Sequence, residues 1–99
     1  MKMEKKVVKF LMDKGFNQAR VYFKDLALAV LIVKKNGTQL DRVYSKVAEE
    51  TNQSLNTVTF HFHRAYQFSK TYLNDKASGP LEMVSNLVKE YWYGKQENC

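Results

Sequence analysis

A run of eight apolar residues, Leu26 to Val33, lies inside a longer apolar segment, Val21 to Lys35. The run is too short to cross a membrane, which takes about 20 residues in a helix, so we expect it inside a protein core. The β-branched residues of the segment are also typical of a strand. Its length, its alanines and the Lys-Lys-Asn-Gly sequence at its end favour a helix. Because this helix is apolar on nearly every side, other elements must surround it.

Four other segments carry apolar residues at the spacing of amphipathic helices. They are residues 4–14, 38–50, 54–72 and 81–93. The chain has 4 glycines and 1 proline, too few for the many turns of an all-β fold. We therefore expect an all-α protein, a compact bundle of five to six helices. At 99 residues it has the length of one domain.

Composition excludes several classes of protein. Aromatic residues make up 13% of the chain, which supplies enough apolar area for a folded core. The single cysteine, Cys99, provides neither an internal disulfide nor a Cys/His metal cluster. The N-terminal sequence does not have the pattern of a secretory leader. We therefore expect a cytoplasmic protein with no metal, no cofactor and no membrane association.

The formal net charge is +6 and the sequence pI is about 9.5, which favours a polyanionic partner such as nucleic acid. The charge is unevenly distributed. Residues 1–35 contain nine Lys or Arg and three Asp or Glu, whereas residues 36–99 contain seven of each kind. The basic excess thus lies in the N-terminal third of the chain. It lies outside residues 38–72, for which a DNA-binding motif is predicted in the next paragraph, so the net charge alone is weak support for DNA binding.

Residues 47–61 have the spacing of a helix-turn-helix. Ala48 is small, as the close crossing of two helices requires, and Asn52 tolerates the left-handed backbone of the turn. Ser54 is a good cap for a second helix whose free N–H groups would face a phosphate. Val58 is the branched apolar residue that anchors this helix. We predict a helix-turn-helix over about residues 38–72, with the recognition helix from Ser54 to Tyr72.

Four stretches carry a resemblance to a known family: Gly15-Phe16, VYFKDLA at 21–27, VYSKVAEE at 43–50 and VTFHFHRA at 58–65. In order and spacing, over about residues 5–75, the chain resembles the C-terminal DNA-binding effector domain of stage zero sporulation protein A, the sporulation master response regulator. The resemblance implies a helical bundle around a helix-turn-helix that binds promoter DNA as a tandem dimer.

The chain departs from that family at several positions. Ser45 stands where the family usually has a proline, and Thr59, Phe60 and His61 occupy a helix that is rich in Arg and Glu in the family. The family protein also has an N-terminal phosphoacceptor domain, which this sequence does not supply. The resemblance therefore does not imply regulation by phosphorylation within the same chain.

Successive residues of an α-helix are rotated by about 100° around the helix axis. Val58 is expected to point inward. The outward side chains then have the chemistry of groove contacts: amides suit adenine, a guanidinium suits guanine, and apolar groups suit the thymine methyl. The candidates for base contact are Asn56, Thr59, Phe60, His63, Arg64 and Gln67. The candidates for phosphate contact are Lys46, Ser54, Thr57 and Lys70.

These candidates have other interpretations. Any one polar residue on an exposed helix face is, by itself, more simply explained as solvated. Phe60 is consistent with a contact to DNA, to a partner chain or to the last helix. His61 and His63 are about 200° apart on a helix, so they do not bind one metal ion together, and we expect His61 to be packed and hydrogen-bonded.

No catalytic constellation or phosphate-binding glycine loop is present in the sequence, so we expect no enzyme activity, and no small-molecule substrate is evident. We expect sequence-specific binding of double-stranded DNA by a transcriptional regulator. A homodimer is expected, with helix 81–93 as the dimerisation candidate, because a near-neutral recognition unit binds weakly alone. The alternative is a protein-interaction module on the same scaffold that modulates another regulator.

Overall fold

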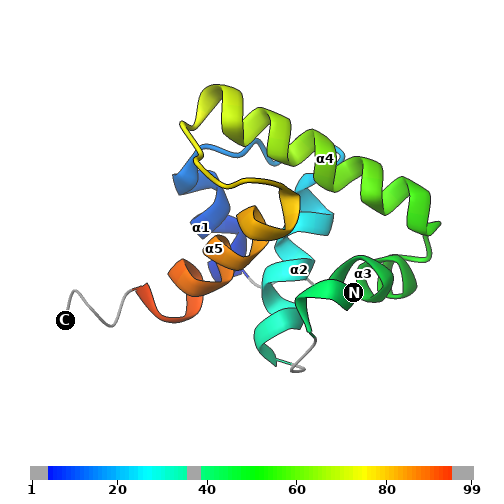
Figure 1. The fold of residues 1–99 in the computed structure, drawn as a ribbon. Coiled ribbons are helices and arrows are strands. Elements are labelled where there is room, and N and C mark those ends of the chain that lie inside the picture. The colour runs from blue at the N-terminus through cyan, green and yellow to red at the C-terminus, as the bar shows by residue number, and fades with distance from the viewer. Residues whose placement is uncertain (1–4, 36–38, 95–99) are drawn as a thin grey trace.

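The computed structural model describes residues 5–35 and 39–94 (Figure 1). Within these ranges the chain forms helices and no strands, which confirms the predicted all-α bundle. The elements are α1 (Lys5–Lys14), α2 (Phe23–Lys35), the 3₁₀ helix η1 (Leu40–Arg42), α3 (Val43–Thr51), α4 (Leu55–Tyr72) and α5 (Pro80–Trp92).

Helix α2 occupies the centre of the bundle. Every residue from Leu26 to Ile32 is buried, and α2 contacts each of the four other α-helices. Figure 1 shows α2 behind and below the long helix α4, with α3 on one side and with α1 and α5 on the other. The prediction of a central helix is therefore confirmed.

Two predicted helix starts are wrong. Val21 and Tyr22 precede α2, because the backbone there makes two successive turns, with Arg20 N bonded to Asn17 O and Phe23 N bonded to Arg20 O. The helix predicted from residue 38 is broken at Arg42, whose φ of −108° and ψ of 1° separate η1 from α3. Thr38, the first residue of the predicted helix, lies outside the described residues.

The end of α1 is fixed against the end of α4. Gly15 has a φ of 111°, which favours glycine, and a Cβ there would lie 2.6 Å from Leu73 Cδ2. Phe16 N then bonds to Leu11 O at 3.0 Å, and the Phe16 ring is buried. The tight turn at Gly15 leads the chain into the loop between α1 and α2, which runs beside α4 (Figure 1).

Helix α5 closes the bundle with its apolar face. The buried residues of this face are Met83, Val84, Leu87 and Val88. Beyond them, the indole Nε1 of Trp92 donates a hydrogen bond to Val30 O of α2 at 3.0 Å, and the Tyr91 ring packs edge-on against Phe10 of α1. The apolar face of this helix, which is the dimerisation candidate, is thus used within the chain.

Candidate nucleic-acid interface

A three-residue turn, Asn52 to Ser54, joins α3 to α4. Asn52 has φ 57° and ψ 41°, the left-handed conformation expected from the sequence. The backbone N–H groups of Asn52 and Gln53 both donate to Ala48 O. The Ser54 Oγ caps α4 by accepting from Thr57 N at 3.1 Å. The predicted left-handed turn at Asn52 and the predicted cap at Ser54 are confirmed, and Ala48 and Val58 are buried as expected.

A buried carboxylate holds this turn against the core. Asp25, in the first turn of α2, is 2% exposed. His61 Nδ1 lies 2.7 Å from Asp25 Oδ2, and Gln53 Nε2 donates to Asp25 Oδ1 at 3.0 Å and to Thr51 Oγ1 at 2.7 Å. The expected hydrogen bond of His61 is present. Sequence reasoning did not identify Asp25 as its partner, although Asp25 is the only acid in the apolar segment.

Helix α4 has a buried inner face and an exposed outer face. Its buried residues are Val58, Phe62, Ala65 and Ser69. Five of the six candidates for base contact are exposed: Asn56, Phe60, His63, Arg64 and Gln67. The sixth, Thr59, is half-buried, and its Oγ1 donates to Leu55 O at 2.8 Å. The helix contains no Asp or Glu, so its outer face carries no negative charge.

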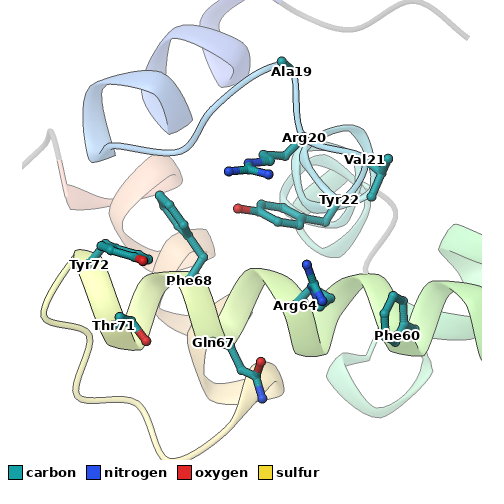
Figure 2. Close-up of a pocket in the computed structure, with 10 residues that line it drawn as sticks. All are labelled: Ala19, Arg20, Val21, Tyr22, Phe60, Arg64, Gln67, Phe68, Thr71 and Tyr72. Atoms are coloured by element: carbon teal, nitrogen blue, oxygen red, sulfur yellow. The ribbon is translucent and has the colours of Figure 1, made fainter.

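A groove divides these candidates into two sets. Phe60, Arg64 and Gln67 line one wall of a groove of about 620 Å³, and the loop from Ala19 to Tyr22 lines the opposite wall (Figure 2). The remaining wall residues are Phe68, Thr71 and Tyr72. Asn56, Thr59 and His63 do not line it. The groove therefore includes three of the six candidates; of the other three, Asn56 and His63 are exposed and Thr59 is half-buried.

Two arginines give the groove its charge. Arg64 Cζ lies 5.6 Å from the Phe60 ring centroid, a cation–π distance, and Arg20 projects from the loop (Figure 2). Burial raises the pKa of Tyr22, and the nearby Arg20 and Arg64 partly offset that rise. Sequence reasoning missed Arg20, because no local pattern links a loop residue to a helix so distant in the chain.

The candidates for phosphate contact do not converge on one point. The Ser54 and Thr57 hydroxyls, 2.8 Å apart, lie at the start of α4. Lys70 is exposed in the last turn of α4, about 24 Å along the helix axis from Ser54. Lys46 on α3 is half-buried and paired with Glu49 at 3.4 Å. Phosphate contacts by all four would thus fall at separated points along a duplex.

Two further properties concern only the part of the chain that the structure describes. No helix there is both long and apolar enough to cross a membrane. No three His, Cys, Asp or Glu residues are grouped there as metal ligands.

Comparison with protein-family models, with curated proteins and with solved structures finds no match for the chain.

Proposed function

We propose that the chain binds double-stranded DNA sequence-specifically through α4 and acts as a transcriptional regulator. The observation that carries this proposal is the outer face of α4, which is free of acidic residues, largely exposed, and begins at a capped turn after α3. Such a helix fits the major groove of B-DNA, about 12 Å wide, and the proposal takes α3, the turn and α4 as a helix-turn-helix.

Each exposed side chain has a role in this proposal. Asn56 and Gln67 pair their amides with adenine, Arg64 pairs with guanine, and Phe60 meets a thymine methyl. His63 offers a ring nitrogen to a base edge. Thr59 contributes its methyl group, because its hydroxyl is bonded to the backbone. The phosphate contacts are assigned to Lys46, Ser54, Thr57 and Lys70.

The proposal includes a homodimer, as the resemblance to the sporulation regulator implies. Residues 36–99 carry seven basic and seven acidic residues, and phosphate neutralisation supplies much of the affinity of DNA-binding proteins. Two linked copies on half-sites about 34 Å apart would compensate for weak binding by one. Sedimentation equilibrium with and without duplex measures this. A complex with one copy per duplex at saturation contradicts the dimer.

The test begins with selection of bound duplexes from a random library. Fluorescence anisotropy then measures the affinity of the selected duplex for the wild type and for Asn56→Ala. We expect about tenfold weaker binding by the variant, because a bidentate amide–base contact is lost. Asn86→Ala is the matched control, since Asn86 is an exposed asparagine on α5. Lys70→Ala is expected to reduce the salt slope by about one unit without changing sequence preference.

Two results would contradict the proposal: no duplex is enriched at low salt, or Asn56→Ala and Asn86→Ala weaken binding equally. Circular dichroism of each variant shows whether the fold is retained.

The protein-interaction module is favoured by one observation. Phe60 is 57% exposed although its ring is large and apolar, and such residues are enriched at protein interfaces. This alternative predicts that the selection recovers no duplex. It also predicts that, in a pull-down, the Phe60→Ala variant loses a protein partner that the wild type retains.

A further inference from the structure

The groove beside α4 has features that contact with a DNA duplex does not require. It lies between two elements that are distant in the sequence, the α1–α2 loop and the C-terminal two-thirds of α4 (Figure 2). Exposed apolar side chains stand on both rims, with Val21 on the loop side and Phe60 and Tyr72 on the α4 side. Its volume of about 620 Å³ is within the range of small-molecule sites.

The charge of the groove has one sign. Arg20 comes from the loop wall and Arg64 from the α4 wall, and no Asp or Glu is among the lining residues. Figure 2 shows the Tyr22 ring between these two arginines. Two guanidinium groups that line one groove without a carboxylate are complementary to an oxyanion, which arginine binds by forked hydrogen bonds.

Tyr22 supplies an independent observation. Its side chain is 5% exposed, and its buried hydroxyl has no hydrogen-bond partner among the described residues. Buried hydroxyl groups in folded proteins nearly always have a partner, and each exception calls for an explanation such as a missing ligand. Arg20 is exposed, and Figure 2 shows its side chain next to that of Tyr22. A ligand oxyanion that draws the Arg20 guanidinium toward itself would also give the Tyr22 O–H an acceptor.

We propose that this groove binds a small aromatic oxyanion, a planar ring that carries a carboxylate or a phosphate. Arg20, Arg64 and the Tyr22 hydroxyl hold the oxyanion, and the ring packs against Phe68 and Tyr72, whose ring centroids are 5.2 Å apart. The occupant is a free small molecule and not the DNA backbone, because the exposed aromatic rims match a ring and have no counterpart in a phosphodiester chain.

A ligand in this groove would regulate the proposed DNA binding, and this part of the inference rests on the proposed function. The groove includes Phe60, Arg64 and Gln67, three of the six candidates for base contact. One set of side chains does not contact a ligand and a base edge at once, so ligand and duplex exclude each other. The ligand therefore acts as a negative effector.

Calorimetric titration tests the site without DNA. The probes are phenyl phosphate, benzoate and the uncharged benzyl alcohol. We expect saturable binding of one equivalent of phenyl phosphate or benzoate, and binding of benzyl alcohol at least about tenfold weaker, because a charge-assisted contact is missing. The tighter of the two anions identifies the oxyanion.

Three variants test the residues. Tyr22→Phe removes only the hydroxyl, and Arg20→Gln removes one guanidinium; each is expected to weaken anion binding about tenfold. Arg42→Gln is the control, because Arg42 is an exposed arginine that does not line the groove. The proposal is overturned if neither anion binds, if benzyl alcohol binds as tightly as the anions, or if Arg42→Gln weakens binding as much as Arg20→Gln.

A competition experiment tests the regulation. The anion that binds more tightly is added to the complex of the wild type with the selected duplex. We expect it to raise the apparent Kd for the duplex in the wild type and to have a much smaller effect in Tyr22→Phe. Anion binding with unchanged duplex affinity overturns the regulatory part alone. If no duplex is ever selected, the proposed function is wrong. The ligand site is then still tested by calorimetry alone.

Discussion

His61 and His63 lie two positions apart on α4 in opposite environments. His61 contacts the buried Asp25 carboxylate at 2.7 Å, whereas His63 is exposed. We expect His61→Ala to lower the free energy of unfolding by about 2 kcal/mol, because the buried Asp25 carboxylate loses one hydrogen-bond partner and keeps Gln53. His63→Ala is expected to change it by no more than about 0.5 kcal/mol. Urea denaturation measures both, and equal losses would contradict the Asp25–His61 contact.

Tyr44 makes the stability depend on pH in the alkaline range. Its ring stacks on Phe62 at 4.6 Å, and burial raises its pKa from 10.0 to about 12. Between these values the unfolded chain loses the phenolic proton and the folded chain keeps it. The contribution of Tyr44 to stability is therefore full below pH 10 and falls as the pH rises toward 12.

Urea midpoints at pH 9, 10 and 11 test this dependence. Tyr44→Phe is expected to decline less steeply above pH 10 than the wild type. An identical decline in both proteins would show that Tyr44 is not the group responsible.

Tyr22→Phe is expected to stabilise the unliganded protein. The Tyr22 hydroxyl is buried without a partner among the described residues, and leaving such a group unpaired costs about 1–3 kcal/mol. Its removal should therefore raise the free energy of unfolding, by about 1 kcal/mol. A decrease of similar size would mean that the hydroxyl is satisfied in solution.

At the scale of the elements, the turn between α3 and α4 sets the position of the proposed recognition helix. Asn52 has a left-handed backbone, which costs a residue with a Cβ about 1–2 kcal/mol and glycine almost nothing. We expect Asn52→Ala to lower the free energy of unfolding by about 1 kcal/mol and Asn52→Gly to leave it nearly unchanged. Thermal denaturation compares the two, and equal effects would contradict the left-handed assignment.

This turn was predictable from the sequence because its determinants are local. Asn52, Ser54 and Val58 lie within a few residues of one another, and each has a conformational or packing preference that the sequence alone reveals. The start of α3 was not predictable, because the apolar spacing runs unbroken through Arg42, while the backbone there departs from a helix. Apolar spacing indicates which face of a helix is buried. It does not indicate a break in the backbone between a 3₁₀ helix and an α-helix.

In the molecule as a whole, folding brings one basic residue of the N-terminal segment close to α4. The sequence places the basic excess in residues 1–35, apart from α4. The tight turn at Gly15 and the loop that follows bring Arg20 from that segment to the groove beside Arg64. The exposed face of α4 was predictable from helical periodicity. The groove was not, because it depends on how the α1–α2 loop packs against α4.

The most direct test of DNA binding by α4 is a heteronuclear NMR titration of the ¹⁵N-labelled protein with the selected duplex, with a scrambled duplex as control. We expect the largest amide shifts on α4, from Asn56 to Gln67, and much smaller shifts with the scrambled duplex. Amides of α5 should shift little. An unchanged spectrum at low salt, or shifts that are largest on α5, would contradict DNA binding by α4.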